Sequence, residues 1–493
     1  MSVTQGREVL LRGGTVIDGE LTPPPAASIE HRDPSTGEVQ ATVSIADHAT
    51  VDRAVRSAAE AGRTWRATPP EERRDALLAW ADLIESRGDD LRSIAARENG
   101  TPIALADPRR TTRWIRHYAG YADKLEGRLV ATAVGHDYVV PTPYGVVGAI
   151  VPFNGPMATV AMKAGPALAA GNTVVVKPSE LAPFSSVVLA ELAVEAGLPA
   201  GALNVVQGDA TTAEALVRHR LVRKVSFTGG TQTGRRVMEA AAAGPKPVAL
   251  ELGGKSPLIV FPDADLDATV PFACSFGLVM LSGQNCQRTS LILVHEQVYA
   301  EVRDRLVAAT EGIRLGPALD WDTEMGPVIS AAAADRVVEA VRSATQAGGR
   351  LLAGGQRADG ALAGGYFVPP TVIDGLEPSH PLAQQEVFGP VVTVHPFRDE
   401  AEALGIANGT DFGLAAHVHT RDLARAHRMA GRLEAGSIHV NGFSGVPTGA
   451  PFGGFKDSGF GREGGPWGLE EFLQQKNVYV DLSSGAAESG ARR

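Results

Sequence analysis

Two cysteines stand in this 493-residue chain, and their surroundings differ. Cys286 lies in Ser282-Gly-Gln-Asn-Cys-Gln287, where small and amide residues leave a thiol reachable and offer donors to a developing charge. Cys274 lies in the apolar stretch Pro271-Phe-Ala-Cys-Ser-Phe-Gly277, which is typical of a packed helix. A disulfide between the two would close a loop too short to stabilise so long a chain. The sequence therefore predicts a nucleophile at Cys286 and a buried structural thiol at Cys274.

A thiolate can make a carbonyl carbon tetrahedral, but the thiol must first lose its proton. Because free cysteine titrates at about pH 8.5, a base or a positive environment is required nearby. Glu251 lies between apolar Val248-Ala-Leu250 and Leu252, where an unpaired carboxylate is costly to bury. Six motifs accompany the cysteine segment: Pro152-Phe-Asn-Gly-Pro156, Lys177-Pro-Ser-Glu180, Phe227-Thr-Gly-Gly-Thr-Gln-Thr-Gly234, Glu251-Leu-Gly-Gly-Lys-Ser256, Glu386-Val-Phe-Gly-Pro390 and Pro451-Phe-Gly-Gly-Phe-Lys-Asp-Ser-Gly-Phe-Gly-Arg-Glu463.

The elements that position these motifs follow an α/β pattern. Residues 1–45 predict short β pieces with a turn at Asp33-Pro-Ser-Thr-Gly-Glu38, and helices are predicted over Val51–Arg63 and Glu71–Arg87. Beyond them, β-branched runs alternate with helical stretches, as in buried parallel sheets with crossover helices. These runs are 146–152, 173–177, 203–206 and 224–228, then 257–260, 291–294, 391–394, 415–419 and 437–441. We expect two doubly wound domains.

Charge and hydropathy limit the partners. The net charge is -10, with 46 Lys and Arg against 56 Asp and Glu, which argues against nucleic acid or an anionic membrane. No apolar run approaches the roughly 18 to 20 residues of a membrane span, and the first residues lack a signal-peptide pattern. We expect a cytoplasmic protein with a small-molecule substrate and no metal site. The Arg-, Ala- and Gly-rich composition suggests a bacterial source, and the tail at 483–493 is expected to be disordered.

Together and in this order, the seven motifs resemble those of the NAD(P)-dependent aldehyde dehydrogenase superfamily over roughly residues 20–482. The resemblance implies two Rossmann-like domains and a small antiparallel oligomerisation appendage. It divides the chain into an NAD-binding domain (1–124 and 144–253), a catalytic domain (254–457), oligomerisation segments (125–143 and 471–482) and a flexible tail (483–493).

The resemblance also assigns catalytic roles. Cys286 forms a thiohemiacetal and then a thioester, and Glu251 activates the thiol and the water that hydrolyses the thioester. Asn154 and the Cys286 N–H stabilise the oxyanion, although an asparagine in a Pro-bounded turn would otherwise be a plain turn residue. Lys163 and Glu463 match the residues that relay protons from the base to solvent.

The implied cofactor is NAD. Glu180 follows a strand where the family binds the adenosine ribose, and a carboxylate there accepts from a free 2′-hydroxyl and repels a 2′-phosphate, which favours NAD over NADP. Gly229–Gly234 resembles the pyrophosphate loop, with Gly230 in place of the usual serine. The implied cofactor-binding residues are Val151, Pro152, Phe153, Lys177, Ser179, Glu180, Gly229, Gly230, Thr233, Leu252, Gly253, Glu386 and Phe388.

The substrate is less constrained. The implied funnel is lined by Gly155, Met162, Asn285, Gln287 and Val446. Gly155 replaces a bulky aromatic of acetaldehyde-oxidising members, no Trp or Tyr at these positions could cage a betaine aldehyde cation, and only Arg288 could meet a dicarboxylic semialdehyde. Leu291 stands where many members carry arginine. A medium-sized aliphatic or aromatic aldehyde is favoured.

The sequence also bears on two other functions and on the oligomeric state. A coenzyme A-acylating semialdehyde dehydrogenase generally lacks the glutamate at the position of Glu251, and a structural member of the fold would be expected to lose the thiol or the base. The strand-like segments Leu129–Val140 and Lys476–Leu482 have no place in either large sheet. By resemblance they extend the sheet of one subunit onto another, so a homodimer or homotetramer is expected rather than a monomer with exposed apolar hairpins.

Overall fold

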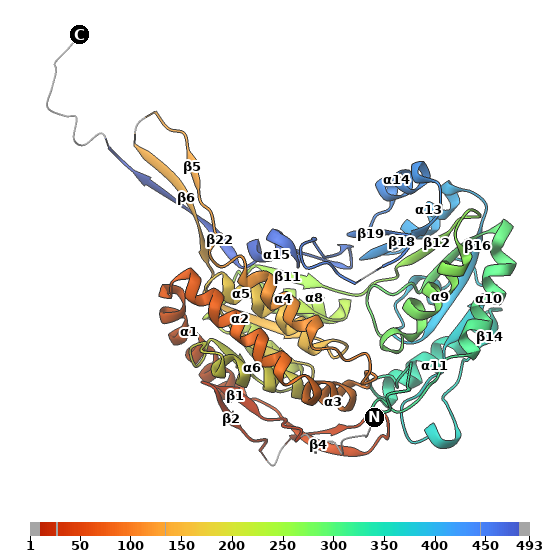
Figure 1. The fold of residues 1–493 in the computed structure, drawn as a ribbon, viewed down its shortest axis with the longest axis horizontal. Coiled ribbons are helices and arrows are strands. Elements are labelled where there is room, and N and C mark those ends of the chain that lie inside the picture. Colours follow the sequence, from red (N-terminus) through yellow and green to blue (C-terminus); the bar gives the residue numbers. More distant parts are fainter. Residues whose placement is uncertain (1–9, 26–27, 134, 444, 483–493) are drawn as a thin grey trace, which may run out of the picture.

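Within the described residues, two large β-sheets with helices packed against them form the body of the protein (Figure 1). The computed structural model describes residues 10–25, 28–133, 135–443 and 445–482. The expected α/β class with two doubly wound sheets is confirmed. The tail at 483–493 lies outside the described residues, and the domain boundaries stay a prediction.

The first sheet has a parallel centre of β9, β8, β7, β10 and β11, with antiparallel strands at its edges. Every residue of β7 and β8 is buried, which explains why they form continuous apolar runs in the sequence. The predicted strands here lie within two residues of the observed ones. In spatial order the strands are β2 (Glu20–Thr22), β1 (Thr15–Ile17), β9 (Leu203–Val205), β8 (Thr173–Pro178), β7 (Val146–Val151), β10 (Val222–Thr228), β11 (Val248–Glu251) and β21 (Gly459–Phe460).

The second sheet is parallel apart from β14 at one edge. Two predicted strands, 257–260 and 415–419, coincide with the observed ones, and three differ by one to three residues at the C-terminal end. In spatial order the strands are β14 (Arg350–Ala353), β15 (Thr371–Asp374), β16 (Val391–Phe397), β13 (Leu291–His295), β12 (Pro257–Val260), β18 (Ala415–His419) and β19 (Ser437–Val440).

Helices pack against these sheets, and local signals set where they begin. The first predicted helix starts earlier than expected, because Asp47 caps it by accepting a hydrogen bond from the Thr50 N–H. The second begins at Pro70, as its proline predicts. The helices are α1 (His48–Ala67), α2 (Pro70–Ser86), α3 (Gly88–Asn99), α4 (Arg109–Ala119), α5 (Pro156–Ala169), α6 (Phe184–Glu195), α7 (Ala210–Arg218), α8 (Thr231–Ala242), α9 (Leu266–Cys274), α10 (Tyr299–Glu311), α11 (Ala331–Gln346), α12 (Pro381–Gln384), α13 (Glu400–Asn408), α14 (Leu423–Arg432) and α15 (Gly465–Glu470).

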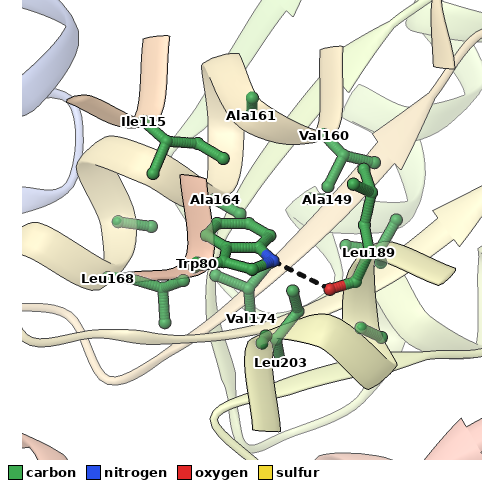
Figure 2. Close-up of a cluster of buried hydrophobic side chains, with 14 of the residues drawn as sticks. Trp80, Ile115, Ala149, Val160, Ala161, Ala164, Leu168, Val174, Leu189 and Leu203 are labelled. Carbon is green, nitrogen blue, oxygen red and sulfur yellow. Dashed lines mark hydrogen bonds between the residues drawn. The ribbon is translucent and has the colours of Figure 1, made fainter. Parts of the chain in front are cut away.

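Trp80 of α2 marks the core that holds the first sheet against its helices (Figure 2). Its side chain is fully buried, and its indole N–H donates to the carbonyl of Leu189 in α6 at 2.9 Å. A buried tryptophan needs such a partner for its N–H. Ile115, Val160 and Leu203 belong to the same cluster, so α2, α4, α5 and α6 share one core with β9. This core supports α5, which follows the Pro152–Pro156 turn.

The segments without a place in the large sheets form an antiparallel sheet of their own. It consists of β5 (Arg128–Val130), β6 (His136–Pro143) and β22 (Leu473–Val480), and it projects from the body (Figure 1). Leu129 and Val480 are exposed on it. The predicted turn at 33–38 joins β3 (Ser28–Arg32) to β4 (Val39–Ser44), and β17 (Phe412–Gly413) pairs with β20 (Phe455–Lys456).

The sequence was expected to contain no segment long and apolar enough to span a membrane, and this expectation was wrong. The stretch Leu266–Gly283 is long and apolar enough, and half of it is buried inside the protein. It covers α9 and the irregular turns that follow, and Val270, Ala273 and Leu278 lie in a core cluster with strands of the second sheet. Its apolar residues therefore pack the second sheet. Cys274 is buried there, as predicted.

Candidate active site

Cys286 is partly exposed and follows a strained backbone segment. Leu281 and Ser282 have φ angles of 52° and 54°, a left-handed conformation that costs non-glycine residues about 1 kcal/mol or more each. The side chain of Gln284 helps to hold this loop, because its Oε1 accepts from the Ile329 N–H at 2.9 Å. The thiol is thus presented by a loop whose conformation its neighbours enforce.

Asn154 lies in the turn between β7 and α5 and reaches the cysteine loop. Its Nδ2 donates to the carbonyl of Gln284 at 2.8 Å, and a side-chain amide has a second N–H to offer. The same turn is held from α3, where the Asn99 amide donates to the Phe153 carbonyl at 2.9 Å. No local pattern marks Asn99 as a support, because its partner is 54 residues away in the chain.

Glu251 ends β11 and is 4% exposed, and neither carboxylate oxygen has a hydrogen-bond partner among the described residues. Burial raises the pKa of Glu251 well above its ordinary value, Glu463 raises it further, and Lys163 opposes them. The pKa of the Cys286 thiol is also raised, first by burial and then by the Glu386 and Glu251 carboxylates. The surroundings of the thiol therefore supply a base and not a positive field.

Lys163 and Glu463 form a buried ion pair beside this base. Lys163 Nζ lies 2.7 Å from Glu463 Oε1, with side-chain exposures of 1% and 9%. The same Nζ donates to Ser226 Oγ of β10 at 2.9 Å. A paired and hydrogen-bonded ammonium can be buried without losing its charge. The structure therefore brings both expected relay residues to one place, although 300 positions separate them.

A cavity of about 470 Å³ lies at the C-terminal ends of β7, β8 and β10 and reaches Cys286. Ligands of α/β sheets bind at this edge. Asn154 and every residue expected to contact the cofactor line it. The lining also contains residues that were not expected to contact the cofactor. Phe227, Thr228 and Val387 lie in the quoted motifs, and the others belong to ordinary helices and strands: Ile150, Ala210, Ala213, Val237 and Arg336.

The residues around this cavity fit a dinucleotide. Gly230 is the N-cap residue of α8 and makes no side-chain capping bond, which leaves the first N–H groups of the helix for a phosphate. Glu180 lines the cavity and lies 3.2 Å from Lys177 Nζ, where a carboxylate can accept from a ribose hydroxyl. Phe153 and Phe388 meet edge to face with ring centres 5.7 Å apart.

Glycine is required where the Glu386 carboxylate approaches the backbone. A Cβ on Gly253 would lie 2.3 Å from Glu386 Oε2. Glu386 Oε1 accepts from the Gly254 N–H at 3.1 Å, and burial raises the pKa of Glu386 to about 7. This carboxylate is therefore held in place at the cavity wall next to the cysteine loop.

The expected substrate-funnel residues do not line this cavity. Met162 and Val446 pack against the same core cluster, and Asn285 Oδ1 accepts from the Gln287 N–H at 3.0 Å. Gln287 is buried. A Cβ on Gly155 would meet nothing within 4 Å, so this position faces open space. The role of these five residues stays a prediction.

Arg288 is not available to a substrate carboxylate. It is buried, and its Nη1 donates to the carbonyls of Gly277 and Val391 at 2.9 and 2.8 Å. Leu291, the other departure from the family pattern, is a buried residue of β13. Among the residues that the structure describes, no group of three or more His, Cys, Asp or Glu side chains could hold a metal ion.

Comparison with known proteins agrees with this geometry. The profile of the Aldehyde dehydrogenase family matches residues 22–478. DhaS of Bacillus subtilis (strain 168) is 37% identical over 492 residues, 98% of this chain and 99% of that protein. PnpE, solved in complex with nicotinamide adenine dinucleotide, is 40% identical with a TM-score of 0.93, over 96% of this chain and 98% of that chain. An aldehyde dehydrogenase from Bacillus cereus, solved with NAD⁺, is 37% identical with a TM-score of 0.92, over 96% of this chain and 97% of that chain. The chain therefore belongs to the aldehyde dehydrogenase family.

Proposed function

We propose that this protein oxidises an aldehyde to the carboxylic acid with NAD, through a thiohemiacetal and a thioester on Cys286. The observation that carries the proposal is the buried Glu251 carboxylate, which has no hydrogen-bond partner among the described residues and is near enough to raise the pKa of the Cys286 thiol. That thiol is partly exposed and lies at the wall of a dinucleotide-sized cavity. A carboxylate whose pKa is raised is a stronger base at neutral pH than an ordinary glutamate.

The first half of the reaction makes and oxidises a tetrahedral adduct. Glu251 takes the thiol proton while the Cys286 sulfur adds to the carbonyl carbon. The second N–H of Asn154 and the Cys286 N–H stabilise the oxyanion. When bound, NAD would supply the acceptor for the hydride of this carbon. Glu180 and Lys177 would hold the adenosine ribose, the N-terminus of α8 would hold the pyrophosphate, and Glu386 would hold the nicotinamide ribose.

The second half of the reaction releases the acid by hydrolysis. A water molecule attacks the thioester carbon and gives a proton to Glu251, and the Cys286 sulfur leaves. Lys163 and Glu463 pass the thiol proton from Glu251 to solvent before this step, which leaves the carboxylate free to accept, and they pass the water proton on after it. A coenzyme A-acylating reaction needs no such base, so the retention of Glu251 favours hydrolysis. Retention of both thiol and base also argues against a purely structural protein.

Glu251→Gln tests the hydrolytic step. The variant loses the base for both steps, but hydrolysis should be slowed more than acylation, because water is a weaker acid and a weaker nucleophile than a thiol. Acyl-enzyme should therefore accumulate, seen as a burst of about one NADH per site followed by turnover slowed by roughly 10²-fold or more. Mass spectrometry of the quenched protein should show the acyl group on the peptide that contains Cys286. If no acyl-enzyme accumulates, and if coenzyme A accelerates the wild-type protein, the thioester is captured by a thiol and not by water.

The substrate proposed is a medium-sized aliphatic or aromatic aldehyde. The open space beyond Gly155 supports a wide entrance, and the engagement of Arg288 by two backbone carbonyls argues against a dicarboxylic semialdehyde. A panel of aldehydes assayed with NAD at one enzyme concentration decides between these classes. We also propose a homodimer or homotetramer joined through the β5, β6 and β22 sheet, and a cytoplasmic location.

A further inference from the structure

A second ion pair, with its lysine buried and its glutamate partly buried, accompanies the pair of Lys163 and Glu463. Lys224 Nζ of β10 lies 2.5 Å from Glu471 Oε2, with side-chain exposures of 3% and 21%. Both residues line a surface cavity of about 390 Å³, together with Tyr144 and Arg462. Burying two charges costs free energy, so a pair in this position needs a reason beyond stability.

The pair joins the two segments that hold the relay residues. Glu471 Oε1 accepts from the Arg462 N–H at 3.0 Å, which fixes the backbone one residue before Glu463. Lys224 stands two positions before Ser226 in β10, so both side chains point to the same face of the strand. Ser226 accepts from the ammonium that Glu463 pairs with. The Glu471 carboxylate thus ties the loop of Glu463 to the strand of Ser226.

We propose that Lys224 and Glu471 are positioning residues for the hydrolytic step, which hold the Glu463 loop in register with β10 and set the basicity of Glu251. This inference rests on the proposed role of Glu251 as the base. Neither residue reaches the reacting atoms. Both act through Glu463 and Lys163.

The surrounding charges give the proposal a direction. Glu251 is faced by Glu463, Lys163, Arg462, Glu471 and the Cys286 thiol, and the negative charge of Glu471 adds to the rise in its pKa. The ion pair itself is faced by Arg462 and, across the surface cavity, by Tyr144 and Glu470. Loss of the Glu471 charge should therefore make Glu251 a weaker base. Loss of the Lys224 charge leaves Glu471 unneutralised and should make Glu251 a stronger base.

Two single variants test this through the pH dependence of thioester hydrolysis. The rate of thioester hydrolysis should fall at acid pH with a midpoint set by Glu251. In Glu471→Gln this midpoint should move to lower pH by about 0.5 unit, and in Lys224→Met it should move to higher pH by a similar amount. The NADH burst rate and NAD affinity should stay within about threefold of wild type. Glu470→Gln is the matched control, because this exposed neighbour lines the same surface cavity without bonding the Glu463 loop.

A double variant completes the cycle. Lys224→Met with Glu471→Gln removes both charges, so its midpoint should return to within about 0.2 unit of wild type. If one single variant fails to fold, the shift of the other carries the test. Single-variant midpoints that stay at the wild-type value, or that move in the same direction in both single variants, would overturn the inference while Glu251→Gln still accumulates acyl-enzyme. If Glu251→Gln accumulates none, the proposed hydrolytic function itself is wrong and the inference falls with it.

Discussion

Asn154 donates a hydrogen bond of 2.8 Å from its side-chain amide to the carbonyl of Gln284, two residues before Cys286. The bond joins the turn after β7 to a loop 130 positions later in the chain. Because one N–H of the Asn154 side chain is held in this bond, the plane of its amide group is fixed. The second N–H of the amide therefore points in one direction. A donor that is oriented before the reaction needs no reorganisation when charge develops on the substrate oxygen.

Asn154→Ala should slow acylation by about 10² to 10³, because the developing oxyanion loses a donor and the cysteine loop loses an anchor. The rate of the NADH burst in a single turnover measures this. Asn408→Ala is the matched control, since its amide also donates to a backbone carbonyl, that of Arg432, but does not line the cavity. A burst rate within threefold of wild type in the Asn154 variant would remove this residue from the mechanism.

The two cysteines should respond differently to the same substitution. Cys286→Ala should abolish turnover and leave NAD affinity close to wild type. Cys274→Ala should keep its activity and lose about 1 kcal/mol of stability, because it leaves a small void in the core of the second sheet. Steady-state assays, NAD titration and urea unfolding of both variants measure these effects. Residual oxidation above a few per cent in the Cys286 variant would assign the nucleophile elsewhere.

The Glu180 carboxylate should favour NAD over NADP in the ratio of kcat/KM. Lys177 Nζ lies 3.2 Å from it, yet the carboxylate still lines the cavity. Glu180→Gln keeps an acceptor for a ribose hydroxyl and removes the charge that repels a 2′-phosphate. It should therefore raise kcat/KM for NADP more than it lowers kcat/KM for NAD. Glu180→Ala should lower the NAD value as well. A wild-type ratio at or below one would show that the carboxylate does not select the cofactor.

Truncation after Gln475 should break the assembly. It removes the part of β22 whose residues Lys476 to Val480 pair with Val140 to His136, so the antiparallel sheet loses an edge strand. Light scattering should report a smaller particle than the intact chain. A chain that ends after Leu482 is the control and should keep its mass. A monomeric intact protein, or a truncation that keeps both mass and activity, would contradict the proposed interface.

His417 should make the protein sensitive to acid. Its ring is fully buried in β18 and stacks on the His439 ring, and burial lowers its pKa to about 3. The unfolded chain binds a proton on this ring below its ordinary pKa of 6.5 and the folded protein does not, so stability is full above 6.5 and falls as the pH drops toward 3.

His417→Phe removes this contribution and keeps a ring beside Phe276 and His439. Urea unfolding between pH 7 and pH 4 should show a smaller loss of stability in the variant than in the wild type. His427→Gln changes an exposed histidine of α14 and serves as the control. Equal losses in all three proteins would show that His417 becomes protonated without unfolding.

Much of the fold could be predicted from the sequence because its signals are local. A buried parallel strand is a continuous apolar run, so 257–260 was predicted to the residue. The strand at 415–419 was also predicted to the residue, although His417 and His419 interrupt its apolar run. The proline signal predicted the start of α2 to within one residue, whereas helical spacing alone predicted the start of α1 three residues too late because the capping Asp47 was not considered. The order of the seven motifs identified the family for the same reason, since each motif is a short stretch with its own backbone requirement.

The tertiary structure alone decided what surrounds the reacting groups. Three contacts join residues more than 100 positions apart: the Lys163–Glu463 ion pair, the hydrogen bond from Asn154 to the Gln284 carbonyl, and the Lys224–Glu471 ion pair. The carboxylates that raise the pKa of Cys286 come from separate strands and loops, and the membrane-length apolar stretch Leu266–Gly283 became part of a core. Burial and charge depend on every element packed around a side chain, and no local pattern records that packing.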